Sequence, residues 1–163
     1  MAAIDPILEE LTREAATTRR VLERVPADRL SWKPHPKSKS VGELAWHIAG
    51  IPRRLAAMVQ HDDVDLTTIK APPMPETSAE IVAGFDRQLA EAKELLSQLD
   101  DSAAARTTTM RRGDVKVFSG PRLALLRTVM LNHGYHHRGQ LTVYLRLLEV
   151  PVPGVYGPSA DEG

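Results

Sequence analysis

Three of the six histidines in this sequence have the spacing and surroundings of metal ligands. His133 and His137 are four residues apart, so on a helix they lie one above the other on a single face. Apolar residues at steps of three or four follow the same face, which is therefore predicted to point toward the core. Two buried imidazoles need partners for their ring nitrogens, and a divalent metal ion or a network of polar groups would satisfy them.

His47 is the third histidine, and it is predicted to point inward from another helix. It shares an apolar stripe with Leu44, Ile48 and Ile51. A single inward histidine is more often a core residue with satisfied hydrogen bonds, but three of them on two helices favour a metal site. Three neutral imidazoles leave at least one coordination position open for water or a substrate, which is typical of catalytic sites.

The composition excludes several classes of protein and of metal ligand. The chain has 163 residues, so we expect one domain over residues 1–163 with a sizeable core. The 21 Lys and Arg residues balance the 21 Asp and Glu residues, so no basic surface for nucleic acid is expected. No apolar run is long enough to span a membrane and no secretory signal is visible, so we expect a cytoplasmic protein. Because the sequence contains no cysteine, any metal must be held by histidine and carboxylate groups.

Four predicted helices position the histidines. Their apolar residues recur with helical spacing, and they span residues 5–25, 40–60, 77–99 and 121–149. Ser40 and Glu43 have the pattern of a capping box at the start of the second helix. Pro52 lies inside that helix and predicts a kink there, or a break near Gly50.

These helices predict an all-α fold, a four-helix bundle in up-down-down-up order. The long connection at residues 61–75 can cross the length of the bundle, which leaves the second helix antiparallel to the fourth. His47 then lies about 10 Å from the start of the second helix, and His137 about 18 Å from the end of the fourth, so the histidines can meet. Two β-prone runs around Gly113 and Asp114 predict a short β-hairpin between the third and fourth helices.

Several motifs, in their order and spacing, resemble the DinB-like superfamily of metalloenzymes. These motifs are Trp32-Lys33-Pro34, Ser40-Val41-Gly42-Glu43-Leu44, His47, His133-x-x-x-His137, His137-Arg138-Gly139-Gln140 and the tail from Pro153 to Glu162. The resemblance covers residues 5–162 and implies a four-helix bundle, often dimeric, that binds a divalent metal through three histidines. The implied ligands in this sequence are His47, His133 and His137. Known members include S-transferases that use low-molecular-weight thiols, and a thiol-dependent isomerase.

Two functions remain open at this point. The first is a metal-dependent hydrolase or thiol S-transferase, in which zinc or nickel, or else iron or manganese, activates a water or a low-molecular-weight thiol toward a small molecule. The second is a non-catalytic metal-binding bundle of the stress-response type. An open coordination position would favour the enzyme, and a protein side chain in that position would favour a structural role. The resemblance also implies a homodimer, with Ala56, Val59 and Leu125 as candidate contacts.

Four residues are candidates for catalytic or substrate-binding roles. Glu43 lies one turn before His47, and it could act as a base, orient a ligand or only complete the capping box. Gln140 and Tyr144 each lie seven residues beyond a histidine and could border the site, although Tyr144 could equally be a core aromatic residue. The tail is long enough to bring Tyr156 beside the metal, or it could cap the end of the bundle.

Overall fold

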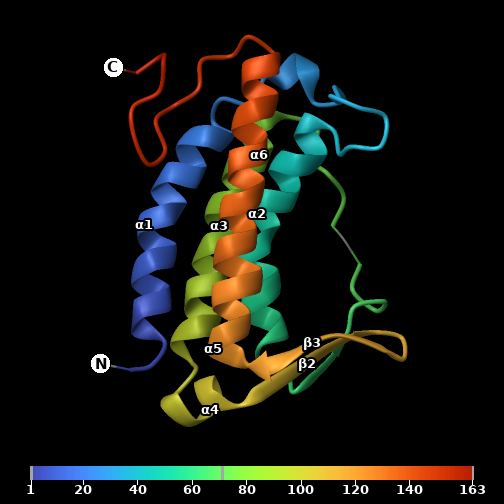
Figure 1. Ribbon diagram of the computed structural model, residues 1–163, viewed down its shortest axis with the longest axis vertical. Coiled ribbons are helices and arrows are strands. Elements are labelled where there is room, and N and C mark those ends of the chain that lie inside the picture. Colours follow the sequence, from blue (N-terminus) through green and yellow to red (C-terminus); the bar gives the residue numbers. More distant parts are fainter. Residues whose placement is uncertain (1, 71, 163) are drawn as a thin grey trace.

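The computed structural model describes residues 2–70 and 72–162, which form a bundle of four long helical segments (Figure 1). Three of these segments are continuous helices: α1 (Asp5–Leu22), α2 (Val41–Met58) and α3 (Ser78–Ser97). The fourth consists of three pieces joined end to end: α5 (Arg122–Leu125), the π-helical segment η2 (Leu126–Asn132) and α6 (His133–Leu147). Two short helices lie in the connections: the 3-10 helix η1 (Ala27–Arg29) and α4 (Asp101–Ala105).

The direction of the helices places α2 antiparallel to α6. In Figure 1, α1 and α6 run from the bottom to the top, whereas α2 and α3 run from the top to the bottom. The connection between α2 and α3 returns along the outside of the bundle, which allows these two consecutive helices to run in the same direction (Figure 1). Residues early in α2 therefore lie at the same end of the bundle as residues late in α6.

Local sequence signals account for where the helices begin. The Ser40 hydroxyl accepts a hydrogen bond from the Glu43 N–H, and the Glu43 carboxylate accepts one from the Ser40 N–H, which confirms the predicted capping box. Thr77 and Glu80 form a second capping box at the start of α3. Helix α2 continues through Pro52 to Met58, so the predicted break before this proline does not occur in the helix.

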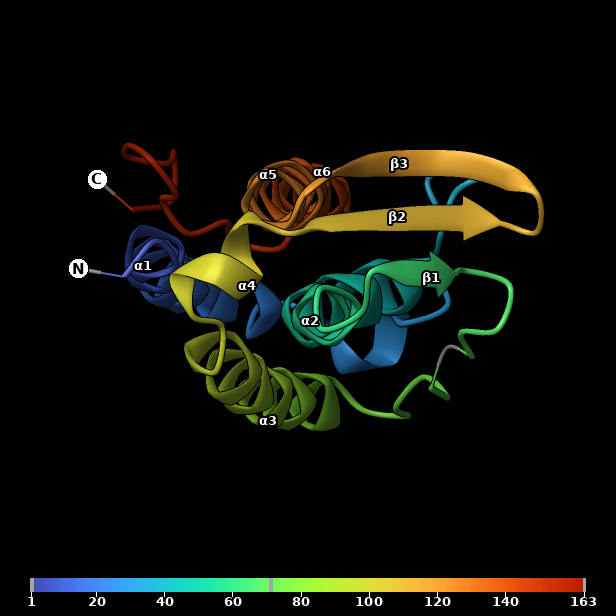
Figure 2. The ribbon, with the colours of Figure 1, turned by 90° about the horizontal axis from the view of Figure 1, so that it is seen from below.

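A small three-stranded sheet lies beside one end of the bundle, so the protein is mostly helical rather than all-α (Figure 2). Its strands are β1 (Asp63–Asp65), β2 (Thr107–Arg112) and β3 (Val115–Pro121). Strand β2 lies in the centre, antiparallel to β3 and parallel to β1. The predicted hairpin is present as β2 and β3, but the sheet is not a hairpin alone, because the connection between α2 and α3 supplies its third strand, β1.

The strand β1 has no sequence signal because it is short and acidic. The structure shows why it is nevertheless extended: Arg111 of β2 forms ion pairs with Asp63 at 2.7 Å and with Asp65 at 2.8 Å. The N–H of Thr109 also donates to the carbonyl oxygen of Asp62 at 2.8 Å. These contacts come from a segment more than forty residues away in the sequence, so only the folded chain provides them.

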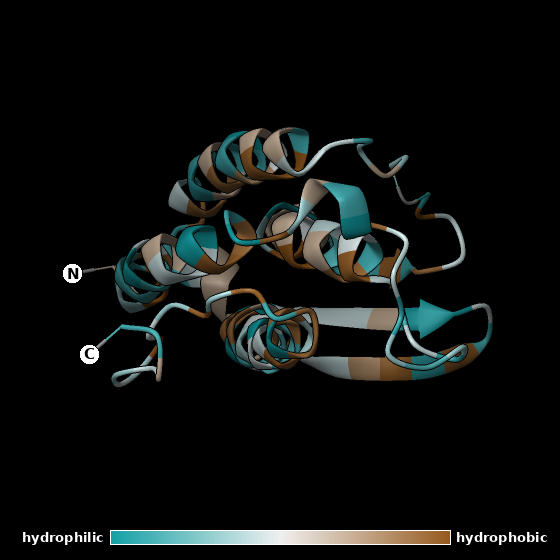
Figure 3. Ribbon diagram, turned by 90° about the horizontal axis from the view of Figure 1, so that it is seen from above, coloured by the Kyte–Doolittle hydropathy of each residue, from teal (hydrophilic) through white to brown (hydrophobic). Residues whose placement is uncertain are grey.

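Apolar side chains from all four helical segments fill the core in two clusters. One cluster includes Leu22, Leu44, Phe85 and Leu141, and the other includes Leu11, Ile51, Leu96 and Met130. Each helix carries both hydrophobic and hydrophilic residues around its circumference, as expected when one face is buried (Figure 3). Ala56, Val59 and Leu125 are each 0 % exposed and pack inside the protomer, so our assignment of them to a dimer contact was wrong. No helix in the described part of the chain is both long and apolar enough to cross a membrane.

Candidate metal centre

The structure brings His47 of α2 together with His133 and His137 of α6. The Nε2 atoms of His47 and His133 are 3.1 Å apart. The His137 ring centroid lies 4.6 Å from that of His47 and 4.3 Å from that of His133. One nitrogen from each ring falls within 4.8 Å of the other two. The three inward histidines that the sequence predicts therefore form one cluster across two antiparallel helices.

The spacing of these nitrogen atoms fits a single metal ion. Imidazole nitrogens bind zinc at about 2.0–2.1 Å, so two of them in a tetrahedral arrangement are about 3.3 Å apart. The separation of 3.1 Å between the Nε2 atoms of His47 and His133 is close to this value. The three nitrogens all lie within 4.8 Å of one another, so the cluster is compact enough to hold one ion.

The protonation state of the cluster also suits a metal. Burial lowers the pKa of all three imidazoles. For His47, burial and the positive charge of Arg54 together lower the pKa to about 3. All three rings are consequently neutral at pH 7 and keep the nitrogen lone pairs that a metal ligand requires.

A π-helical segment directly precedes the two histidines of α6. Leu126–Asn132 has π-helical hydrogen bonding over seven residues, and α-helical geometry returns at His133. A π-helical segment holds more residues per turn, so it changes the direction in which all later side chains point. Such segments inside helices are frequent at functional sites. The sequence predicted an unbroken α-helix over residues 121–149, and no residue type marks this change of hydrogen bonding.

Gln140 orients one of the candidate ligands. Its Oε1 lies 3.0 Å from Nδ1 of His137 and accepts the hydrogen of that nitrogen, which leaves Nε2 of His137 with its lone pair. Its Nε2 donates to the Tyr144 hydroxyl at 3.3 Å. Tyr144 is only 4 % exposed and packs edge-on against Trp32, with the ring centroids 5.8 Å apart. Gln140 thus links the metal cluster to a buried aromatic residue and fixes the tautomer of His137.

Arg54 is a residue of the site that the sequence analysis missed. Its Nη2 lies 3.1 Å from Nδ1 of His47 and 3.2 Å from the carbonyl oxygen of the same residue. Arginine can only donate, so Nδ1 of His47 is the acceptor and the ring proton is on Nε2, which donates to His133. The signal was available in the sequence, because Arg54 lies seven residues after His47 and therefore two turns further along the same helix face.

Glu43 has the capping role that was one of its three predicted roles. Its carboxylate accepts from the Ser40 N–H at 2.6 Å and lies 3.5 Å from Nζ of Lys33. The Ser40 hydrogen bond and the lysine charge hold the pKa of Glu43 below its usual value, so it is ionised at neutral pH. It also lines the same cavity as His47, where a carboxylate could still accept a proton.

Tyr156 lies in a different part of the molecule. Its hydroxyl donates to Oε2 of Glu14 at 2.8 Å and accepts from Nη2 of Arg138 at 2.5 Å. Arg138 is 1 % exposed, and it also forms an ion pair with Glu14 at 2.7 Å. The tail continues along the same surface, where Glu162 pairs with Arg20 of α1. The structure therefore joins Tyr156 to α1 and to Arg138, rather than to the three histidines.

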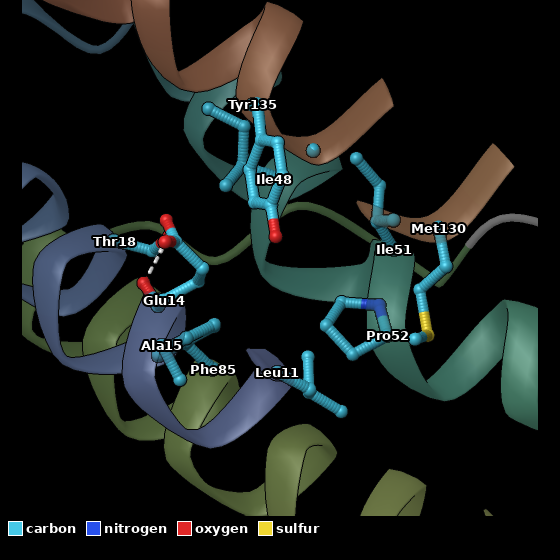
Figure 4. Close-up of a pocket in the computed structure, with 11 residues that line it drawn as sticks. Leu11, Glu14, Ala15, Thr18, Ile48, Ile51, Pro52, Phe85, Met130 and Tyr135 are labelled. Atoms are coloured by element: carbon cyan, nitrogen blue, oxygen red, sulfur yellow. Dashed lines mark hydrogen bonds between the residues drawn. The ribbon is translucent and has the colours of Figure 1, made fainter. Parts of the chain in front are cut away.

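Two of the cavities that border the helices carrying the histidines differ greatly in size. The smaller one lies among α1, α2 and α6, where Leu11, Glu14, Ile48 and Tyr135 face it (Figure 4). Its volume of about 40 Å³ is enough for water but not for a substrate. The larger one has a volume of about 330 Å³, and we call it the His47 cavity. Its lining includes Lys39, Glu43, Trp46, His47, Arg54 and Gln88.

The fold and the site define the class of this protein. It is a helical bundle with a candidate metal site made of three histidines on two antiparallel helices. The DinB family model matches residues 2–163, so the chain belongs to the DinB family, as its motifs predicted. It is 30% identical over 165 residues to the uncharacterized protein YrdA of Bacillus subtilis (strain 168), with 98% of this chain and 91% of that protein covered.

Two solved structures share the fold. A DinB-like protein from Bacillus cereus ATCC 10987 superposes with a TM-score of 0.72 at 27% identity, covering 92% of this chain and 95% of the other. The DinB-like protein YjoA from Bacillus subtilis superposes with a TM-score of 0.71 at 21% identity, covering 94% of this chain and 100% of the other. These two structures show that the bundle fold is shared, and the family model shows the family.

Proposed function

We propose that the protein is a metal-dependent enzyme that uses His47, His133 and His137 to hold a divalent ion. A divalent ion in this position would lower the pKa of a water or a low-molecular-weight thiol, so that the corresponding anion would be available as a nucleophile near neutral pH. The observation that carries the proposal is the cluster itself: three neutral, half-buried imidazoles within 4.8 Å of one another, beside a cavity of about 330 Å³. The reaction would be a hydrolysis or a thiol transfer on a small molecule.

The number of protein ligands supports a catalytic rather than a structural site. Among the residues that the structure describes, the metal-ligating cluster consists of the three histidines alone. Structural zinc sites have four protein ligands, whereas catalytic sites have three and keep a position for water or substrate. Imidazole ligands suit zinc and nickel, which we propose as the physiological ions, and they also accept iron. Manganese, which prefers oxygen ligands, fits this donor set less well.

The chain's own residues would prepare the site for this reaction. Gln140 holds His137 in the tautomer that presents Nε2 to the ion. Glu43 provides an ionised carboxylate on the wall of the His47 cavity, where it could take up the proton of the nucleophile. Tyr144 supports Gln140 from the core. The cytoplasmic location expected from the sequence stays a prediction.

We also propose that the protein forms a homodimer, as the family resemblance implies. Val143 and Leu147 are each 57 % exposed, and they lie four residues apart on the outer face of α6. Two exposed apolar side chains on one helix face are suited to a contact with a second copy. Light scattering on wild type and on Val143→Lys would test this, since the variant should dissociate. A monomeric wild-type protein at high concentration would contradict the proposal.

The proposed activity is tested by metal analysis followed by an activity screen. Protein prepared without an affinity tag should contain about one divalent ion per chain, and His47→Ala and His133→Ala should each remove it. His136→Ala is the matched control, because His136 lies in the same helix but is exposed. The metal-loaded protein should then catalyse hydrolysis or thiol transfer in a substrate screen. Full metal occupancy without turnover would favour the alternative, a metal-binding bundle without catalysis.

A further inference from the structure

Positively charged side chains gather around the His47 cavity although the protein as a whole is neutral. The chain has 21 basic and 21 acidic residues, but the cavity is lined by Lys39, Arg53, Arg54 and Lys70 against one carboxylate, that of Glu43. Arg53 is neutralised by an ion pair with Glu91 at 2.5 Å, and Glu43 is paired with Lys33. In the described part of the chain, Lys39, Arg54 and Lys70 take part in no ion pair, so their charges remain available to a ligand.

These charges lie close to the three histidines. Arg54 contacts Nδ1 of His47 at 3.1 Å. Lys39 is near enough that its charge helps to lower the pKa of both His47 and His137. Positive side chains beside a site for a divalent cation weaken the binding of that cation. Metal binding therefore gives no reason for their presence, whereas the recognition of an anionic ligand does.

A buried amide supports a polar ligand at the same place. Nε2 of Gln88 is buried and, among the described residues, has no hydrogen-bond partner, although Gln88 lines the cavity. A buried donor without an acceptor costs free energy unless a ligand or water supplies one. Gly50 borders both side chains: a Cβ atom there would be 3.3 Å from Oε1 of Gln88 and 3.6 Å from Cζ of Arg54. Glycine at this position thus keeps a side chain from filling the space next to the Gln88 amide and the Arg54 guanidinium.

The remaining wall of the cavity is apolar. Trp46, Ile69 and Met74 line it, and Ile69 and Met74 are 37 % and 40 % exposed. Exposed apolar side chains at the edge of a polar cavity are suited to cover the hydrocarbon part of a ligand. A volume of about 330 Å³ lies at the low end of the range for small-molecule sites.

We propose that the His47 cavity binds small organic anions, with Arg54, Lys39 and the Gln88 amide holding the acidic group and Trp46 holding an apolar body. This proposal rests on the proposed function, because the bound anion would be the substrate of the proposed enzyme. Nη2 of Arg54 already donates to His47, so the N–H groups on Nη1 and Nε remain to donate charge-assisted hydrogen bonds to a carboxylate or phosphate group. The bound ligand would lie directly beside His47 and hence beside the reacting centre.

The test compares probes that differ in charge but hardly in shape. Phenylacetate and phenylacetamide would be titrated by calorimetry into the metal-loaded protein and into the metal-free protein. Phenyl phosphate and inorganic phosphate would show whether phosphate can replace the carboxylate and whether the apolar body is needed. We expect phenylacetate to bind about tenfold more tightly than phenylacetamide, because the amide lacks the charge that the cations recognise.

Variants show whether the cavity or the metal causes this preference. Arg54→Gln and Lys39→Gln should each reduce the binding of phenylacetate about tenfold, in the metal-free protein as well. Lys37→Gln is the matched control, since Lys37 is exposed on the same loop and outside the cavity lining. Lys39 is itself exposed, so Lys39→Gln should leave folding intact. This variant therefore tests the anion site even if Arg54→Gln misfolds.

Each outcome separates this inference from the proposed function. Equal binding of phenylacetate and phenylacetamide, or no binding of either, would overturn the anion site. A preference that disappears on metal removal and is unchanged in both variants would also overturn it, because the metal alone would then bind the carboxylate. Failure of wild-type protein to bind any metal would refute the proposed function, but the anion measurement on the metal-free protein would still stand.

Discussion

The guanidinium group of Arg54 donates to the His47 ring and thereby sets the tautomer of this candidate metal ligand. Nη2 of Arg54 lies 3.1 Å from Nδ1 of His47, so Nδ1 carries its lone pair and the ring proton is on Nε2. A metal ion on Nε2 requires the opposite tautomer, with the proton on Nδ1, where it would face the N–H groups of the arginine. His137 has no such conflict, because its Nδ1 hydrogen already points to the Gln140 oxygen. His137 therefore already has the tautomer that metal binding through Nε2 needs, whereas Arg54 holds His47 in the other tautomer.

Arg54→Gln should increase metal affinity about tenfold. The variant removes a positive charge from beside the ion, and its amide oxygen can accept the Nδ1 hydrogen of metal-bound His47. Competition with a chromogenic chelator would measure the dissociation constant. Arg53→Gln is the control, because Arg53 is adjacent in sequence but pairs with Glu91. Affinity equal to or below that of wild type would show that Arg54 does not oppose the ion.

Gln140→Ala should weaken metal binding by about tenfold or more, since residues that orient metal-bound histidines contribute this much to affinity. The variant leaves Nδ1 of His137 without the acceptor that now lies 3.0 Å away. Gln140→Glu should retain the affinity, because a carboxylate accepts the same hydrogen bond. The exposed Gln98 provides a control in Gln98→Ala. If Gln140→Ala and Gln98→Ala bind the ion equally well, Gln140 has no orienting role.

The metal-free protein should lose stability as the pH falls from about 6.5 to 4.5. Unfolded histidine takes up a proton near pH 6.5, whereas His47 in the folded protein stays neutral down to a pKa of about 3. The unfolded state therefore binds more protons in this range, and the free energy of unfolding falls by up to about 1.4 kcal/mol per pH unit for each such group. Below this range the carboxylates with lowered pKa, such as Glu10, add to the loss.

Denaturant unfolding at several pH values would measure this effect. His47→Gln should make the pH dependence less steep, because glutamine binds no proton in either state. His61→Gln serves as the control, since His61 is exposed in the connection after α2. The same slope in wild type and His47→Gln would contradict the assignment of the effect to His47.

Tyr156→Phe should reduce the free energy of unfolding by about 1–2 kcal/mol and leave metal binding unchanged. The variant removes one hydrogen bond to Glu14 and one to Arg138, both on the α1 side of the last helix. Arg138→Ala should cost about 3–5 kcal/mol, because it leaves the Glu14 carboxylate, only 12 % exposed, without its partner. Loss of metal from Tyr156→Phe would instead show that the tail contributes to the histidine site.

The sequence by itself determined the helices and the histidine cluster. The capping box of Ser40 and Glu43 and the apolar periodicity are local properties, so they specify where a helix begins and which face it buries. The i, i+4 spacing of His133 and His137 on a buried face, together with His47 on another, was enough to predict that the three rings meet.

Tertiary structure alone decided the remaining features, because each depends on contacts between segments far apart in the chain. Strand β1 is extended because Arg111 and Thr109 pair with it, not because of its own residues. The π-helical turns before His133 are a choice of hydrogen-bond partner that no residue type specifies. The burial of Val59 and Leu125 depends on which helix faces meet. Lys39, Arg54 and Lys70 come from three separate parts of the chain. Only folding places them around one cavity, where they produce the positive charge beside His47.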